Sequence, residues 1–356
     1  MQQRVIPVRV REGYQAVIGG GLLRESGRLL RETLGDCRLA VVTDSNVATL
    51  YLNPVLASLT EAGFDACSYA FPAGEAHKRL DTLSGMLEFF AEQHLTRKDC
   101  VVALGGGVTG DMAGFAAGCY LRGVRFAQIP TTLLAAVDSS VGGKTAVDLV
   151  AGKNLAGLFH QPSIVICDTD TFATLSPDEF ANGAAEAIKT GILDDETLFS
   201  LFESGDVRAN IQEIVAQCVA FKAKIVEEDE TETGIRKTLN LGHTAGHAME
   251  RCSDYTIPHG HAVGAGLAII ARASERLGWA TAPIARCIEA ALTRNGLPIT
   301  TEFTPEALAE AALSDKKRAG GTITIVVPRS IGDCALIDIP VGQLADVFRA
   351  GLEADA

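Results

Sequence analysis

The residues whose types and spacing best suit chemistry are one glutamate and four histidines in the second half of the chain. Glu186 lies in the segment GAAEAIKTG, and four of the seven histidines lie at positions 243, 247, 259 and 261. His243 and His247 are four residues apart, so they share one face of a helix. One carboxylate and two imidazoles form a common catalytic zinc shell with an open fourth position. The sequence therefore predicts a divalent metal site, against the alternative of packed or surface histidines, but spacing alone does not choose among the four.

A glycine-rich turn in the first half of the chain indicates a second kind of site. The segment VVALGGGVTGDMAGFAAG places Gly105, Gly107 and Gly110 in G-x-G-x-x-G spacing, between an apolar run and a helical pattern. In that context glycines let backbone N–H groups approach a pyrophosphate at a helix N-terminus. The usual acidic ribose partner downstream is absent, because residues 125–137 contain no Asp or Glu, and the candidate acids, Asp44 and Glu75, lie upstream. The turn favours dinucleotide binding over a merely tight strand–helix connection.

Cationic side chains recur beside glycine, small residues and Asn between the expected elements. Most single cations on an acidic protein are solvated surface charges, but segments such as SSVGGKTAVD are too glycine-rich and apolar for a generic surface. Glycine beside lysine suits a close approach to phosphate or carboxylate. If they converge, these groups predict a multiply anionic substrate. They are Arg122, Lys144, Lys153 with Asn154, Lys189, Lys222, Arg236 with Asn240, and Lys316.

The elements that must position these residues follow two different patterns. Short apolar runs at 37–45, 64–72, 99–107, 125–132 and 163–168 alternate with amphipathic segments at 46–63 and 75–93, which predicts a parallel sheet with helices on both faces. From 176 onward long helical patterns dominate, and only 322–328 and 333–340 look extended. The predicted fold is α/β, with a Rossmann-like parallel-sheet domain over residues 1–172 and a mainly helical metal- and substrate-binding domain over 173–356. A ligand cleft is expected where two such domains meet.

Composition excludes several classes of protein. The formal net charge of −13 disfavours partners such as nucleic acid and anionic membrane surfaces. Nine cysteines without a C-x-x-C pair predict small core residues in a reducing cytosol. The N-terminal segment MQQRVIPVRV has no apolar signal region, and no apolar stretch is long enough to span a bilayer. We therefore expect a cytoplasmic protein.

Taken together, a dense set of motifs resembles the 3-dehydroquinate synthases, within the sugar phosphate cyclases. The resemblance covers nearly the whole chain and rests on PAGEAHK, GGGVTGDMAGFAA, RGVRFAQIPTTLLAAVDSSVGGKTAVD, GKNLAGLFHQP, GAAEAIKTGI, DETETGIRKTLNLGHTAGHAME and HGHAV. It implies a two-domain fold that binds NAD and zinc, or cobalt, and a homodimer. The implied reaction closes 3-deoxy-D-arabino-heptulosonate 7-phosphate into 3-dehydroquinate with release of phosphate.

The resemblance also implies roles for individual residues. Zinc is implied to be held by Glu186, His243 and His259, and His247 and Glu232 are implied to handle protons. The implied NAD contacts are Asp44, Asn46, Glu75, Lys78, Gly105, Gly106, Gly107, Asp111, Thr131, Thr132, Lys153, Thr171, Thr174 and Asn182. The implied substrate contacts are Arg122, Asp138, Lys144, Asn154, Lys189, Lys222, Arg236, Asn240 and Lys316.

Two details refine these expectations. Lys189, Arg236 and Asn240 keep the pattern of the dehydroquinate enzymes, which implies a substrate with both a carboxylate and a phosphate. The family usually has H-G-E at the second zinc histidine, whereas this chain has His259-Gly260-His261. The missing carboxylate removes one candidate support for the metal, and it makes His261 an alternative ligand.

Two rival functions remain at this point. A metal-dependent polyol dehydrogenase has the same architecture, but it yields net NADH and does not need so many cations. An NAD-binding sensor without catalysis does not need Glu186, His243, His259, Lys189 and His247 together. Release of phosphate from the heptulosonate phosphate, with and without a chelator, distinguishes the three.

Overall fold

The computed structural model describes residues 3–313 and 321–353, and the chain divides into two compact units. The N-terminal unit comprises the chain up to Leu175 together with Lys222–Thr231, and the C-terminal unit comprises Ser176–Phe221 and the chain from Glu232 onward. This first division lies close to the boundary expected between 172 and 173. The sequence did not indicate that Lys222–Thr231 belongs to the N-terminal unit. One uninterrupted helix, α8 (Ile211–Glu228), supplies residues to both units, and helical periodicity does not reveal which unit a residue packs in.

A seven-stranded sheet with the order β1-β2-β9-β6-β5-β3-β4 forms the centre of the N-terminal unit. The strands pair in parallel except for β1 and β2, which are antiparallel. Strands buried on both faces require nearly continuous apolar runs, and the buried pattern of β5 has this property. The strand bounds are β1 (Arg4–Val8), β2 (Tyr14–Gly19), β3 (Arg38–Asp44), β4 (Asp65–Phe71), β5 (Cys100–Gly105), β6 (Arg125–Pro130) and β9 (Ile164–Asp168).

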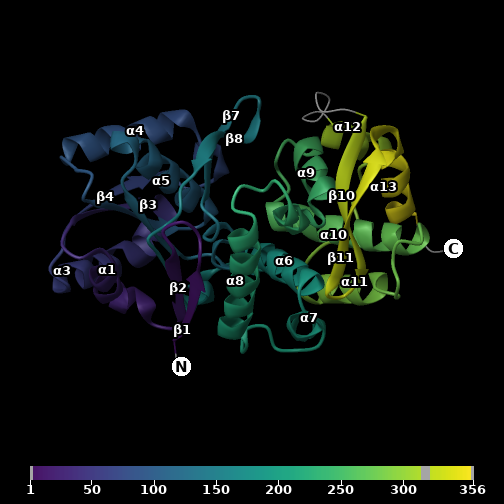
Figure 1. Ribbon diagram of the computed structural model, residues 1–356, viewed down its shortest axis with the longest axis horizontal. Helices are drawn as coiled ribbons and strands as arrows, with labels where there is room; N and C mark the ends of the chain where they lie inside the picture. The colour runs from purple at the N-terminus through teal and green to yellow at the C-terminus, as the bar shows by residue number, and fades with distance from the viewer. Residues whose placement is uncertain (1–2, 314–320, 354–356) are drawn as a thin grey trace. The chain divides into compact units, whose positions relative to one another are not determined.

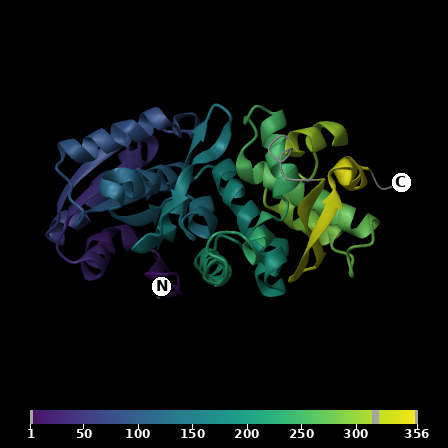
Figure 2. The same cartoon turned by 45° about the horizontal axis from the view of Figure 1, so that its top comes forward.

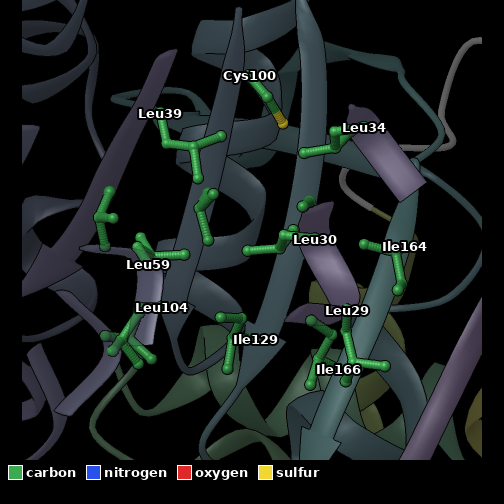
Figure 3. Close-up of a cluster of buried hydrophobic side chains, with 14 of the residues drawn as sticks. Leu29, Leu30, Leu34, Leu39, Leu59, Cys100, Leu104, Ile129, Ile164 and Ile166 are labelled. Carbon is green, nitrogen blue, oxygen red and sulfur yellow. The ribbon is translucent and has the colours of Figure 1, made fainter. Parts of the chain in front are cut away.

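Helices cover both faces of this sheet, as the alternating pattern predicted. On one face α1 (Ser26–Leu34) and α3 (Asn53–Glu61) pack onto the strands, and Figure 3 shows Leu30 of α1 and Leu59 of α3 in one apolar cluster with Leu39 and Leu104 of the sheet. On the other face α4 (Leu80–Glu92) and α5 (Gly107–Cys119) enclose a second apolar cluster. Each fully buried leucine contributes about 1.5–3 kcal/mol. These two layers hold the carboxyl ends of β3 and β5 in fixed positions.

A hairpin of β7 (Lys144–Leu149) and β8 (Gly152–Phe159) replaces what the sequence indicated as glycine-rich loops. Its glycines misled the prediction because one of them serves close packing: a Cβ on Gly157 would lie 2.1 Å from the carbonyl oxygen of Thr145. The hairpin therefore carries Lys144, Lys153 and Asn154 on strands.

The C-terminal unit is mainly helical and contains one antiparallel pair, β10 (Thr322–Ser330) with β11 (Asp333–Pro340). Figures 1 and 2 show this yellow ribbon beside the green helices of its own unit. Within the described ranges, no helix is long and apolar enough to cross a membrane. The other elements of the unit are α6 (Pro177–Leu193), α7 (Glu196–Glu203), η7 (Ile235–Asn240), α9 (His243–Cys252), α10 (His259–Arg276), α11 (Ala285–Arg294), α12 (Pro305–Leu313) and α13 (Leu344–Leu352).

Helix α6 is the central helix of this unit. Ser176 caps it by accepting the N–H of Glu179 at 3.2 Å, and Pro177 occupies the first turn, where its missing N–H costs nothing. Apolar and small residues surround the helix on all sides, which is typical of a helix buried in a core. Glu186 and Lys189, only 1% and 2% exposed, are the charged residues in the buried part of α6. Two ionisable groups at such a position need a specific partner or a function.

Candidate active site

Three of the predicted metal-binding side chains meet in the C-terminal unit, although they come from three different helices. Glu186 lies in the middle of α6, while His243 and His259 are the first residues of α9 and α10. The Nε2 atoms of His243 and His259 lie 3.5 and 3.4 Å from Oε1 of Glu186. One oxygen and two nitrogens at this spacing, all within 4.8 Å of one another, match the donor set of a divalent metal site with an open position.

The orientation of His243 fits this use. Its Nδ1 lies 3.0 Å from the carbonyl oxygen of Leu241, which can only accept, so Nδ1 must donate. The Nε2 lone pair of the neutral ring then faces Glu186. The carboxylate oxygens of Glu186 are buried and accept no regular hydrogen bond from the described residues, although Nζ of Lys189 lies 2.5 Å from Oε2. A buried carboxylate without regular hydrogen bonds needs cationic neighbours, and a divalent ion would be such a neighbour.

The charges of the group are strongly coupled. Burial raises the pKa of Glu186, but Lys189, His243 and His259 outweigh burial and hold it well below its usual range. Burial lowers the pKa of His243 to about 3. Burial also lowers the pKa of His259, but Glu186 and Glu250 outweigh it and raise the value to about 10. A divalent ion at this group therefore competes with a proton on His259.

The remaining two histidines occupy different places. The ring of His247 lies beside both ligand rings, with centroids 5.2 Å from His243 and 5.8 Å from His259, so it is in reach of the same space. His261 belongs to neither group of clustered donors among the described residues, and its Nδ1 is buried without a hydrogen-bond partner there. Among the described residues, it is His259, not His261, whose donor atom lies with those of Glu186 and His243. Two residues apart on α10, the two side chains point in different directions.

The other predicted residues of the C-terminal unit lie on η7, α6 and the segment before η7. Nδ2 of Asn240 donates to Oε1 of Glu232 at 2.9 Å, so the structure brings these two together. Arg236 is only 1% exposed although it carries a full charge. Asn182, which the resemblance implies for NAD, belongs to this unit, and its Oδ1 accepts the N–H of Gly260 beside His259.

In the N-terminal unit, the strand order reverses direction at the glycine-rich turn. The chain passes from β3 to β4 on one side and returns to β5 on the other side of β3. Ligands of open α/β sheets bind at the carboxyl ends of strands at such a switch point. Asp44 ends β3 there, and Thr109 of the turn's helix donates to its Oδ2 at 3.3 Å. The upstream acid that the sequence indicated thus lies against the glycine-rich turn.

Side chains at this turn would be crowded. A Cβ on Gly105 would lie 2.5 Å from Oγ1 of Thr109, and Cβ atoms on Gly106 and Gly107 would lie 3.1 Å from Cγ2 of Thr132 and 3.2 Å from Oγ of Ser139. Next to it, Thr131 donates its N–H to the carbonyl oxygen of Gly105, while its buried Oγ1 has no partner among the described residues. A glycine-rich helix N-terminus next to a buried hydroxyl without a partner among the described residues fits a pyrophosphate-bearing cofactor.

Lys78 connects the predicted nucleotide residues with the β7–β8 hairpin. Its Nζ lies 2.6 Å from Oδ2 of Asp111 and 2.6 Å from Oδ1 of Asn154. Burial lowers the pKa of Lys78, but Asp111 and further acids outweigh it and raise the pKa above its usual range. Lys153 on the same hairpin lies 3.2 Å from Oε1 of Glu75. Lys78 therefore stays charged. It contacts Asp111, a predicted NAD contact, and Asn154, a predicted substrate contact.

The remaining predicted substrate residues of this unit fall into a pair and two exposed cations. Nζ of Lys222 donates to the carbonyl oxygen of Asp138 at 2.7 Å and to its Oδ1 at 2.6 Å. Arg122 and Lys144 are exposed, Arg122 with a positive φ of 67°. Lys316 lies outside the described residues.

Three side chains that the sequence did not single out support the predicted ones. Tyr51 OH lies 2.6 Å from Oγ1 of Thr174 and 3.1 Å from the carbonyl oxygen of Thr171. Asp148 accepts the N–H of Asn154 at 2.8 Å, and Glu250 lies 3.1 Å from Nδ1 of His259. Glu250 had a signal in the sequence, because it follows His243 by two helical turns and so shares its face. Tyr51 and Asp148 had none.

Comparisons with known proteins agree with this geometry. Residues 68–182 match the family model described as 3-dehydroquinate synthase N-terminal, and residues 183–318 match 3-dehydroquinate synthase C-terminal. A 3-dehydroquinate synthase from Pelobacter propionicus is 43% identical over 348 residues, which cover 96% of each chain. A 2-epi-5-epi-valiolone synthase from Streptomyces hygroscopicus, solved with NAD+ and Zn2+ bound, is 25% identical, with a TM-score of 0.86 over 95% of this chain and 96% of that one. A 2-deoxy-scyllo-inosose synthase complexed with carbaglucose-6-phosphate, NAD+ and Co2+ has the same fold, at 24% identity and a TM-score of 0.87 over 99% of this chain and all of that one.

Proposed function

The chain belongs to the 3-dehydroquinate synthase family, and on that premise we propose that it converts 3-deoxy-D-arabino-heptulosonate 7-phosphate into 3-dehydroquinate and phosphate. This makes it a phosphorus–oxygen lyase of aromatic amino acid biosynthesis. The observation that carries the proposal is the cluster of Glu186, His243 and His259 in a chain that keeps Lys189, Arg236 and Asn240. By the family resemblance, we propose that these last three residues select a substrate with both a carboxylate and a phosphate over other sugar phosphates.

The proposed cofactors are NAD and one divalent ion, zinc or cobalt. Glu186, His243 and His259 supply the ligands for the ion, since their donor atoms already face one another. The glycine turn and the unpartnered hydroxyl of Thr131 support NAD. Two related structures were solved with NAD+ and with Co2+ or Zn2+.

The reaction needs a temporary ketone. Phosphate leaves poorly next to a C–H that is not acidic, and a ketone in place of the neighbouring C5 alcohol makes that C–H acidic. When bound, NAD supplies a reversible hydride acceptor for this alcohol, and the divalent ion supplies a Lewis acid at its oxygen. After elimination the carbonyl is reduced again, the ring opens, and an intramolecular aldol reaction closes the carbocycle.

The side chains of the protein bind and orient the substrate, and they move protons. The cationic side chains of Lys189, Arg236, Lys222 and Lys144 are proposed to bind the anionic groups of the substrate. The ring of His247 lies beside the rings of His243 and His259, and we propose that it transfers protons. Glu232, which accepts a hydrogen bond from Asn240, is its proposed partner in that role.

Product analysis tests the proposed reaction. The purified chain, supplied with NAD and Zn2+, is expected to release one phosphate per dehydroquinate formed from the heptulosonate phosphate, with the product identified by NMR. Glucose 6-phosphate, a phosphorylated sugar without a carboxylate, serves as the matched substrate control and should release no phosphate. Equal turnover of both substrates, or turnover of glucose 6-phosphate alone, contradicts the assignment of substrate.

Two further parts of the proposal concern assembly and location. We propose a homodimer, as the family resemblance implies, and sedimentation of the purified chain at assay concentration tests it. A purely monomeric species contradicts this part alone. We also propose a cytoplasmic location, which accords with nine free cysteines among the described residues and is tested by cell fractionation.

A further inference from the structure

We propose that Glu250 is a positioning residue of the metal site, which holds the ring of His259 with Nε2 directed at Glu186. Oε2 of Glu250 lies 3.1 Å from Nδ1 of His259, and Nε2 of the same ring lies 3.4 Å from Oε1 of Glu186. The ring is therefore held between two carboxylates on its two nitrogens. This inference rests on the proposed function only in assuming that a divalent ion binds at the group of Glu186.

The chemistry of the contact fixes the proton of the ring. An ionised carboxylate can only accept, so Nδ1 of His259 must donate to Glu250. When the ring loses one proton to bind a metal ion, the proton that stays is the one on Nδ1, and Nε2 becomes the ligand. Carboxylates that accept from the second nitrogen of a ligating histidine orient the ring and raise its basicity.

Glu250 lies in a buried and closely packed position. It is only 3% exposed, and it lies on α9, two turns after His243, so one helix supplies both a ligand and the support of another ligand. Helices α9 and α10 approach closely: a Cβ on Gly266 would lie 2.1 Å from the carbonyl oxygen of Gly242, and a Cβ on Gly246 would lie 3.2 Å from the backbone of Val263. This approach fixes the carboxylate relative to His259.

The same geometry explains why the chain tolerates a histidine at position 261. The carboxylate that contacts Nδ1 of His259 comes from α9, not from α10, so the support of the ring does not depend on residue 261. His261 instead has a buried Nδ1 without a hydrogen-bond partner among the described residues. The two ligand histidines are thus oriented differently: His243 by a backbone carbonyl and His259 by a side chain. Because the support of His243 is a backbone carbonyl, only the support of His259, the side chain of Glu250, can be removed by a substitution.

A competing use of Glu250 is as a metal ligand itself. His247, Glu250 and His259 also present donor atoms within 4.8 Å of one another. A second ion there would take Nδ1 of His259, which would leave the ring without its proton while it ligates the first ion through Nε2. A positioning role predicts one tightly bound ion per chain, and a ligand role predicts two.

The test is metal affinity measured without reference to activity. Zn2+ is titrated into apo-protein in competition with a chromophoric chelator, for the wild type and for Glu250→Ala, Glu250→Gln and His261→Gln. We expect one ion per chain and a loss of affinity of about 10–100-fold in Glu250→Ala. Glu250→Gln, which keeps an acceptor oxygen of the same reach, should recover part of that loss, and His261→Gln should stay within about threefold of the wild type. The absorption of bound Co2+ should change in the Glu250 variants because the ligand geometry loosens.

The outcomes separate this inference from the proposed function. If the wild type binds no divalent ion at the group of Glu186, the proposed metal site fails. If it binds one ion and both Glu250 variants keep wild-type affinity, the positioning role alone is wrong. Two bound ions, the second lost in Glu250→Gln, would show a ligand instead. Because glutamine has the size of glutamate, this variant keeps the test valid if the alanine variant does not fold.

Discussion

Replacing Glu186 by alanine is expected to remove the divalent ion and to lower phosphate release from the heptulosonate phosphate by at least about a thousandfold. The loss of one of three ligands weakens metal binding, and the Lewis acid and the orientation of substrate are lost with the ion. The measurements are bound zinc per chain after desalting and initial rates of phosphate release. Added Zn2+ should not restore the rate of the variant, whereas it should restore that of wild-type protein stripped by a chelator.

Two further variants make this result interpretable. Glu186→Ala also removes the carboxylate that pairs with the buried Lys189, and breaking a buried ion pair costs about 3–5 kcal/mol, which can unfold the chain. His243→Gln keeps the ion pair of Glu186 and Lys189 intact, and we expect the same loss of metal and rate from it. Glu179→Ala removes an exposed carboxylate from the same helix and should behave as the wild type. Retained zinc and rate in His243→Gln would remove the basis for this ligand set.

Replacing Lys222 by methionine is expected to lower kcat/KM about 30- to 5000-fold. Lys222 is 8% exposed, its ammonium donates to Asp138 twice, and truncating one partner of a buried charged hydrogen bond costs about 2–5 kcal/mol. If Lys222 also binds an anionic end of the substrate, that contact is lost as well. Binding of NAD, measured by titration without substrate, should change little.

The matched control for this variant lies two residues further along the same helix. Lys224 is exposed, so Lys224→Met removes the same charge from solvent and should leave kcat/KM within about twofold. Equal losses in both variants would mean that overall charge, rather than the contact of Lys222 with Asp138, governs binding of the substrate.

The sequence was most informative where chemistry and periodicity coincide. The strands around Cys100–Gly105 and Ile164–Asp168 were predicted because strands covered on both faces need continuous apolar runs. Helical patterns were predicted from 176 onward, and α6 begins there because the capping roles of Ser176 and Pro177 are local. Helix α9 also agreed with the prediction, because His243 and His247 are four residues apart and their rings lie side by side, with centroids 5.2 Å apart.

The sequence was least informative where the outcome depends on partners distant in the chain. The hairpin β7–β8 was mistaken for loops because its glycines serve a cross-strand approach, which only the pairing reveals. The predicted helix from Glu75 breaks at Lys78, where the backbone turns the lysine toward Asp111 and Asn154. Spacing could not choose among four histidines, because the choice depends on how α9 and α10 pack rather than on either helix alone.

The most direct test of the central claim compares phosphate released with NADH accumulated in one reaction. A metal- and NAD-loaded chain given the heptulosonate phosphate should release phosphate over many turnovers, while NADH absorbance stays below one equivalent of enzyme. This result is expected because the hydride that leaves the substrate returns to it. NADH that accumulates one-for-one with product would identify a dehydrogenase instead, and the proposed use of Glu186, His243 and His259 in a redox-neutral elimination would be wrong.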